Sequence, residues 1–300
     1  MNVPMRAYVL MRRTLRNALL RAGAIDTRLG HLLVQIDAQL HASGVLRAFD
    51  ESETVACHGL ILKFRKEDAP FARTLYLNGD YEPATREAIL ERLVPGSTFV
   101  DLGAHVGYFS LLAGRRVGAE GHVYAFEPTP STRQTLARNI ASNRLGDIIS
   151  IEPFASSDRP GKLRFLVTEA SEGNAVALPN EVGPTIEVDA TSLDTFFEAR
   201  AWPRVDIVKM DVEGQELATL RGMKQLCRRN QHLAVIFEYH LGQIRRTQLD
   251  RLELFACLHE LGFRRFSILF RKRTPIDLPA RLDDLDAIAQ RANVNILAEQ

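Results

Sequence analysis

Short apolar segments alternate with amphipathic segments along most of this 300-residue chain, and the alternation restricts the folds that it can adopt. The apolar segments have the length of strands, and the stretches between them have helical periodicity. The predicted core strands are 98–102, 123–126, 148–154, 205–210, 233–237, 266–270 and 294–297. Strands that alternate with helices favour a mostly parallel sheet with helices on both faces. We therefore predict a doubly wound α/β fold.

The N-terminal part of the chain departs from this alternation. Residues 1–50 are predicted to form a basic, amphipathic helical extension, with a second helical pattern at 31–40. Residues 51–80 have the pattern of a small β segment that includes Leu75–Leu77, and residues 81–300 form the main domain. We expect the basic helix to pack on the main domain with its arginines in water. Contact with a membrane surface or an anionic partner is the alternative.

Charge and cysteine content exclude several classes of protein. The formal net charge is +1, which does not favour nucleic acid as a partner. Three scattered cysteines, Cys57, Cys227 and Cys257, form no CxxC pair, so neither a zinc site nor a disulfide framework is expected. No apolar run approaches the ~18 residues of a membrane-spanning helix, and arginines interrupt any secretory signal. We expect a cytoplasmic protein, and the oligomeric state stays open.

Acidic residues terminate four of the predicted strands. They are Asp101, Glu127, Asp211 and Glu238. Ligands of doubly wound sheets bind beyond the carboxyl ends of the strands. Buried carboxylates need partners, so structural chemistry alone would favour neutral residues there. Four acids in register therefore indicate a ligand site.

The loop after the first core strand favours a cofactor without phosphate. A dinucleotide fingerprint requires G-x-G-x-x-G, but His105 stands at the central position between Gly103 and Gly107. The absent glycine disfavours a close pyrophosphate, and S-adenosylmethionine combines a nucleoside with an amino acid and has no phosphate. A turn that serves only helix–strand packing is the alternative. His105 is expected to adopt a left-handed conformation.

The next strand ends supply candidates for the nucleoside. Glu127 is predicted to accept hydrogen bonds from both ribose hydroxyls, with capping of the following helix as the alternative. Phe154 and Ala155 are placed beside the adenine ring, although Phe154 suits the core equally well. Asp158 contacts the adenine amine or forms a local turn.

These residues together resemble the FkbM-type methyltransferase family. The resemblance covers about residues 74–297 and depends on the motifs at 81–83, 99–108, 124–128, 193–194 and 209–214. It implies a class I methyltransferase (Rossmann-like) fold with a seven-stranded, mostly parallel sheet. It also implies S-adenosylmethionine as cofactor and O-methylation of a hydroxyl on a sugar, glycan or natural product. His105 and Thr129 depart from the pattern, because the family usually has Asn at both positions.

Activation of a hydroxyl requires a general base or a metal ion. The catalytic candidates are His240, Asp211, Glu213 and Glu238. His240 is the natural base at neutral pH, or else a surface histidine. Asp211 and Glu213 orient the acceptor, ligate a divalent cation such as Mg²⁺, or cap the next helix. No residue is assigned as a metal ligand.

The remaining cofactor candidates lie in or near the sequence around the loop that follows the first core strand. Asp101 and Tyr108 belong to the motif itself, and Glu82 is expected to close over the cofactor or to start a helix at Pro83. Lys209 is expected to point away from the cofactor, because strand residues alternate between faces.

Other functions are open on the sequence alone. A metal-dependent O-methyltransferase for small molecules would use Asp211 as a ligand, and a nicotinamide-dependent oxidoreductase would have to lack its central glycine. A catalytically silent scaffold conflicts with the density of acids. Methylation of nucleic-acid bases is disfavoured, because Asp211-Val212-Glu213-Gly214 replaces the usual Asn/Asp-Pro-Pro-aromatic motif. Paired arginines (228–229, 245–246 and 264–265) suit anionic acceptors or solvated helix faces equally.

Overall fold

The computed structural model describes residues 3–21, 54–168, 170–290 and 292–300. The chain divides into two compact units, Met1–Tyr81 and Glu82–Gln300, and each is described by itself. The helical pattern expected at 31–40 lies outside the described residues. Among the described residues, no helix combines the length and apolarity needed to span a membrane.

Within the part of the first unit that the structure describes, two α-helices and a hairpin are present. Its elements are α1 (Val3–Arg21), β1 (Thr54–Cys57), β2 (Leu60–Lys63), η1 (Lys66–Asp68) and α3 (Ala69–Asn78). The strand predicted at Leu75–Leu77 is wrong, because these residues belong to α3. Three apolar residues in a row do not distinguish a strand from a helix. Residues at the two ends of the segment favour a helix: Pro70 lies in the first turn of α3, and Gly79 ends the helix with a left-handed φ of 70°.

Two arginines of α1 are engaged within this unit. Arg12 Nη1 donates to the carbonyl oxygen of Leu77 at 2.9 Å, and Arg13 Nε donates to that of Tyr76 at 2.9 Å. Both bonds satisfy carbonyl groups of the last turn of α3, where positive charge is favourable. Arg12 is buried, so the expectation that the arginines of this helix lie in water is wrong for that residue. Contact of α1 with a membrane or an anionic partner stays a prediction.

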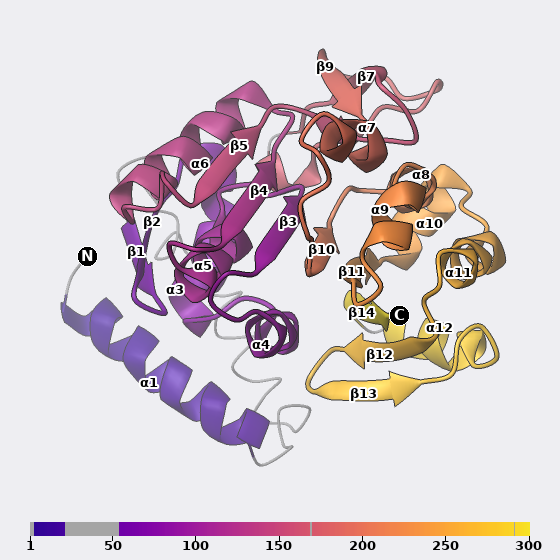
Figure 1. The fold of residues 1–300 in the computed structure, drawn as a ribbon. Helices are drawn as coiled ribbons and strands as arrows, with labels where there is room; N and C mark the ends of the chain where they lie inside the picture. The colour runs from indigo at the N-terminus through magenta and orange to yellow at the C-terminus, as the bar shows by residue number, and fades with distance from the viewer. Residues whose placement is uncertain (1–2, 22–53, 169, 291) are drawn as a thin grey trace. The chain divides into compact units, whose positions relative to one another are not determined.

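The second unit is built on one eight-stranded sheet (Figure 1). In spatial order the strands are β13 (Arg273–Ile276), β12 (Arg265–Leu269), β14 (Val294–Glu299), β11 (Ala234–Tyr239), β10 (Ile207–Met210), β3 (Thr98–Leu102), β4 (His122–Phe126) and β5 (Ile149–Glu152). The neighbouring strands β11, β10, β3, β4 and β5 are parallel to one another. The strands β14, β12 and β13 are added to β11 by antiparallel pairing. The seven predicted strands and the doubly wound fold are confirmed. The edge strand β13 was missed, because it is short and contains Pro275.

The strand order changes direction beside β3. From β3 the chain passes to β4 and β5 on one side, and it later returns to β10 on the other side of β3. A crevice for ligands forms at such a switch point, beyond the carboxyl ends of the strands. The ends of β3, β4, β10 and β11 therefore meet where the sequence places the acids.

Helices cover both faces of the sheet. They are α4 (Pro83–Arg92), α5 (Tyr108–Val117), α6 (Pro130–Ser142), α7 (Leu193–Glu198), α8 (Glu216–Arg221), α9 (Lys224–Arg229), α10 (Leu241–Thr247), α11 (Arg251–Glu260) and α12 (Leu282–Ala289). The helical stretch after β10 is broken between α8 and α9. A Cβ at Gly222 would lie 2.2 Å from the carbonyl oxygen of Ser157, so the chain passes that loop too closely for a side chain. The separate helix α10 precedes α11.

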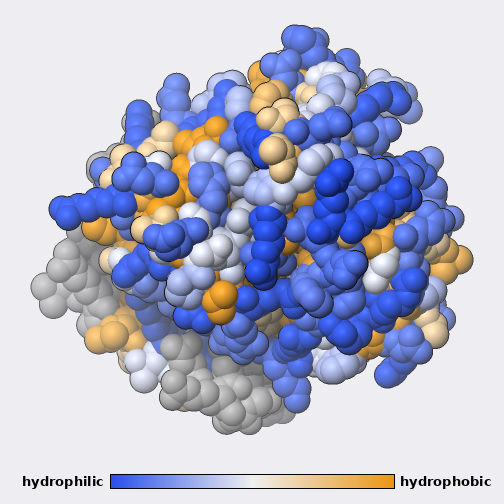
Figure 2. Space-filling model, in the orientation of Figure 1, coloured by the Kyte–Doolittle hydropathy of each residue, from blue (hydrophilic) through white to orange (hydrophobic). Residues whose placement is uncertain are grey.

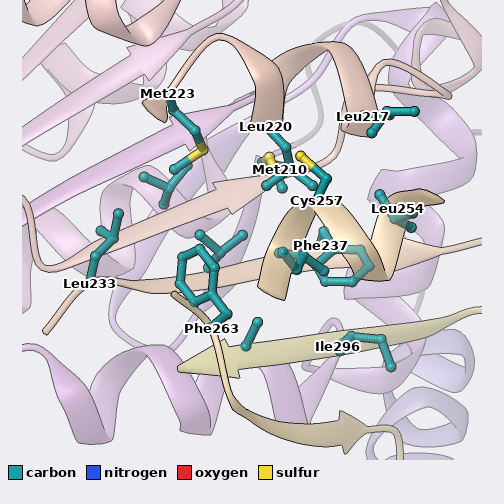
Figure 3. Packing of buried hydrophobic residues seen from close by; sticks show 14 of the residues in the cluster. Met210, Leu217, Leu220, Met223, Leu233, Phe237, Leu254, Cys257, Phe263 and Ile296 are labelled. Atoms are coloured by element: carbon teal, nitrogen blue, oxygen red, sulfur yellow. The ribbon is translucent and has the colours of Figure 1, made fainter. Parts of the chain in front are cut away.

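The core between the sheet and α7, α8, α9 and α11 is continuous (Figure 3). Met210 and Phe237 of adjacent strands pack with Leu220 of α8 and Leu254 of α11. On the opposite face α5 packs on β3, β4 and β5. Alternate residues of β10 therefore face different helices, with Met210 in this core and Lys209 on the side of α5.

A second sheet precedes α7 in the chain. It contains β6 (Ala155–Ser156), β7 (Gly161–Leu166), β8 (Ala175–Val176) and β9 (Thr185–Thr191), in the order β6-β9-β7-β8. We call residues 161–168 and 170–191 the excursion, because they lie outside the main sheet, between β6 and α7 in the chain; its strands β7 and β9 lie near α7 (Figure 1). The face shown in Figure 2 is mostly hydrophilic around it, with hydrophobic residues in small separate groups.

Candidate functional site

The loop from β3 to α5 lies directly against the end of β10. Gly103 has a φ of 79°, and a Cβ added to it would lie 2.0 Å from the carbonyl oxygen of Asp211. Gly107 has a φ of 95°, and a Cβ there would lie 2.5 Å from Leu136 Cδ1. The packing explanation of these glycines therefore holds for Gly107. Because Gly103 has no side chain, the β3–α5 loop can pack closely against the loop after β10, and both loops carry candidate site residues.

Glu127 is held by backbone amides at the end of β4. Its Oε2 accepts from the N–H of His105 at 3.0 Å, and its Oε1 accepts from the N–H of Thr129 at 2.8 Å. His105 has a φ of 51°, so its expected left-handed conformation is confirmed. Thr129 precedes α6, so Glu127 does not cap the first turn of that helix. The Thr129 side chain also donates to this carboxylate, so these three donors leave about one of the roughly four acceptor positions of the carboxylate for another donor.

The predicted adenine residues lie at the end of β5. Ala155 is buried in β6, and Phe154 is partly buried against the core. The side chain of Asp158 is 42% exposed and lies 3.8 Å from Arg159. The strands β3 and β4 separate β5 from β10, which places the two strand ends ~14 Å apart at the usual strand spacing. The candidate residues thus form a row along the carboxyl edge.

Three carboxylates form what we call the acid cluster. Each of Asp211, Glu213 and Glu238 offers an oxygen within 4.8 Å of the others. Asp211 follows β10, and Glu238 lies near the end of the adjacent parallel strand β11. Glu213 is brought back toward them by a tight turn, in which it has a φ of 51° and Gly214 a φ of 95°. Three of the four predicted catalytic residues are therefore together.

Lys209 supplies a positive charge to this cluster. Its Nζ donates to Asp211 Oδ2 at 3.0 Å and lies 4.7 Å from the ring centroid of Phe109, while the side chain is only 2% exposed. Burial alone would lower the pKa of Lys209, but Asp211, Glu82 and Asp101 together raise it above its normal value. The lysine is therefore charged. Its expected orientation away from the site is wrong, because a long side chain on the α5 face still reaches the strand end.

The cluster holds more negative charge than Lys209 balances. Burial, followed by the charges of Asp211 and Glu216, raises the pKa of Glu213 to about 8. Burial, Asp211 and Glu213 raise the pKa of Glu238 as well. Gln243 Nε2 donates to Glu213 Oε2 at 2.5 Å. Crowded carboxylates of this kind stabilise a proton or a cationic ligand between them.

Two further candidates have structural partners that the sequence did not reveal. Glu82 has a φ of 43°, and its Oε2 accepts from Asn295 Nδ2 of β14 at 2.8 Å. Asp101 is 1% exposed and accepts from Ser110 Oγ at 2.5 Å, while burial raises its pKa. Tyr108 is likewise buried. Asp101 and Tyr108 are thus buried residues of the strand and helix that flank the loop. Direct contact with a cofactor stays a prediction for both.

His240 lies beside the acid cluster at the start of α10. It lines a small hollow together with Glu216, Glu238, Tyr239, Gln243, Ile244, Leu249 and Leu254. A small polar group in this hollow would have both His240 and Glu238 among its neighbours. His240 therefore stays a candidate base.

Comparisons with known proteins identify methyltransferases that are similar to this chain. The model of the methyltransferase FkbM domain matches residues 101–265. The chain is 27% identical over 154 residues to hexuronic acid methyltransferase AglP of Haloferax volcanii, covering 51% of this chain and 60% of that protein. It is 26% identical over 163 residues to methyltransferase sdnD of Sordaria araneosa, covering 44% and 62%. The chain thus spans about three fifths of the length of these curated relatives.

Solved structures show a more distant likeness. A SAM-dependent O-methyltransferase from Thermotoga maritima is 14% identical, with a TM-score of 0.42 and coverage of 83% of this chain and 78% of that one.

Proposed function

The chain belongs to the methyltransferase FkbM domain family, and on that premise we propose that it transfers a methyl group from S-adenosylmethionine to a hydroxyl of a sugar, glycan or natural product. The observation that carries the proposal is the Glu127 carboxylate, fixed by two backbone amides at a strand end with acceptor capacity unused. The hexuronic acid in the name of the Haloferax volcanii relative supports a sugar acceptor. Family membership removes the nicotinamide-dependent oxidoreductase as a candidate.

The residues present fit this cofactor. Glu127 would accept the two ribose hydroxyls, and Phe154 and Asp158 would adjoin the adenine. The acid cluster and Glu82 would lie toward the methionyl end, where negative charge favours an ammonium and a sulfonium. When bound, S-adenosylmethionine supplies an electrophilic methyl group.

The protein's own task is to bring the acceptor hydroxyl into line and to accept its proton. Glu238 comes from the end of β11 and Glu213 from the turn after β10, and His240 lines a hollow together with Glu238. We assign the proton to this group of side chains. Asp211 is held by Lys209, so its role is to orient rather than to accept.

A bound divalent cation is the second candidate for activating the hydroxyl. The oxygens of the acid cluster lie within 4.8 Å of one another, and oxygens that share one Mg²⁺ lie at most ~4.2 Å apart. Lys209 and Gln243 already donate to two of the three carboxylates, and an ion would compete with both. The existing donors therefore favour catalysis without a metal.

Methyl transfer tests both statements. We expect labelled methyl groups to pass from S-adenosylmethionine to hydroxyls in a panel of sugars, glycans and small natural products, and the rate to stay within about twofold in excess EDTA. A protein that binds the cofactor but labels no acceptor contradicts the proposed function. Loss of activity in EDTA that Mg²⁺ restores contradicts the metal-free mechanism alone.

Cofactor binding should depend on pH through Glu127. Burial raises the pKa of this carboxyl to about 7, although the amides of Thr129 and His105 favour its charged form. Below pH 7 the group carries a proton that two hydroxyl donors must displace. The affinity for S-adenosylmethionine should therefore fall up to about tenfold per unit between pH 7 and pH 5. Calorimetry measures this slope, and Glu127→Gln should flatten it; equal slopes in both proteins would refute the assignment.

A further inference from the structure

The excursion reaches the carboxyl edge at two separate points. Ser171 Oγ lies 2.7 Å from Nε2 of His105, whose N–H holds Glu127. Further along, Glu181 pairs with Arg246 of α10. The same segment therefore contacts the loop that holds Glu127 and the helix beside the acid cluster.

Arg246 forms a bidentate ion pair with Glu181. Its Nε donates to Oε1 at 2.6 Å and its Nη2 donates to Oε2 at 2.7 Å. The Nη2 group also donates to the carbonyl oxygen of Val176 at 2.7 Å. A guanidinium binds any planar carboxylate in this way, so the position is specific for the group and not for the protein residue that supplies it.

Arg246 is directly connected to the acid cluster. Its Nη1 donates to Gln243 Oε1 at 3.1 Å, and Gln243 Nε2 donates in turn to Glu213 Oε2 at 2.5 Å. One side chain therefore separates the guanidinium from a candidate catalytic carboxylate. Arg246 therefore lies two hydrogen bonds away from the acid cluster, at which the acceptor would bind.

Apart from this pair, the Glu181 carboxylate accepts one hydrogen bond from the backbone N–H of Leu178 at 2.8 Å. The next residue, Val182, is 98% exposed, and α10 itself has no buried residue. Loss of the Glu181–Arg246 pair would thus uncover no core. An incoming carboxylate could replace Glu181 without leaving the guanidinium unpaired, and this avoids the main cost of breaking a partly buried ion pair.

We propose that Arg246 binds a carboxylate of the acceptor, a sugar acid, and that Glu181 occupies this position in the acceptor-free protein. The inference rests on the proposed function and narrows its acceptor class. In this proposal Arg246 determines acceptor specificity, and Glu181 competes with the acceptor carboxylate for Arg246.

Binding of small probes tests the proposal without methyl transfer. The full chain, loaded with S-adenosylhomocysteine, is titrated with glucuronate and galacturonate, with glucose and galactose, and with malate as a carboxylate without a sugar ring. We expect the uronates to bind best. Arg246→Gln should weaken them about 10–100-fold and remove their advantage over the neutral sugars, because two charge-assisted hydrogen bonds are lost. Arg246→Lys should be intermediate, since it keeps the charge without the fork.

The competitor and a neighbour provide the matched controls. Glu181→Gln should tighten uronate binding about tenfold, because the internal carboxylate is gone, whereas Arg245→Gln on the exposed side of α10 should change nothing. Thermal melts confirm that each variant is folded.

Several results would overturn the inference. If Arg246→Gln binds uronates as tightly as the unaltered protein, Arg246 does not bind the acceptor carboxylate. If Glu181→Gln binds uronates more weakly, the Glu181–Arg246 pair only anchors the excursion. Malate binding as tightly as the uronates removes the sugar-acid assignment, and absence of uronate binding in every variant removes the subsite. A failure of the proposed function appears elsewhere, as absent binding of S-adenosylmethionine or absent methyl transfer.

Discussion

Glu127→Ala should weaken the binding of S-adenosylmethionine about a hundredfold or more. The carboxylate would supply both acceptors for the ribose, and hydrogen bonds to a charged group contribute ~1.5–3 kcal/mol each. The substitution also removes the partner of the His105 and Thr129 amides, which fixes the shape of the loop. Isothermal titration calorimetry measures the effect directly.

Two variants separate the charge from the fold. Glu127→Gln keeps the size of the side chain and should recover only part of the affinity, because one of its two polar groups is a donor. Glu198→Ala removes an exposed carboxylate on α7 and should leave the affinity unchanged. Unchanged affinity in Glu127→Ala, in a protein that melts normally, would remove the ribose assignment.

Lys209→Met should reduce the free energy of unfolding by about 3–5 kcal/mol, because it leaves buried carboxylates without their positive partner. The side chain is 2% exposed, and its ammonium faces Asp211, with Asp101 and Glu82 close enough to raise its pKa. Methionine fills a similar volume, so the loss reflects charge rather than a cavity. Urea denaturation measures the change.

A second substitution identifies the partner. Asp211→Asn in the Lys209→Met background should recover part of the lost stability, and the double-mutant cycle should give a coupling of about 1–3 kcal/mol. Lys162→Met removes an exposed ammonium from β7 and should have no measurable effect. Equal effects of the two lysine substitutions would contradict the buried charge network.

The fold could be predicted from the sequence because its signals are local. The apolar runs of β3, β10 and β11 are bounded by glycines and acids, and each is followed by a helical pattern. The misassigned segments had ambiguous local signals. Leu75–Leu77 is too short to show a period, β13 contains a proline, and the break at Gly222 follows from the distant carbonyl group of Ser157.

The site was predictable in part for the same reason. Acids at strand ends are visible in the chain, and the topology brings two of them, Asp211 and Glu238, together, while a tight turn adds Glu213. Their partners come from far along the sequence: Asn295 reaches Glu82 across 213 positions, and Ser171 reaches His105 across 66. A polar residue inside an apolar strand, as at Lys209 and Asn295, was the available signal. A buried polar group needs a partner wherever it lies.

A crystal structure with S-adenosylhomocysteine tests the central assignment most directly. We predict that both ribose hydroxyls donate to the Glu127 carboxylate while the adenine lies toward Phe154 and the amino-acid end toward the acid cluster. A complex in which the ribose lies elsewhere and Glu127 binds only the amides of His105 and Thr129 would contradict the account.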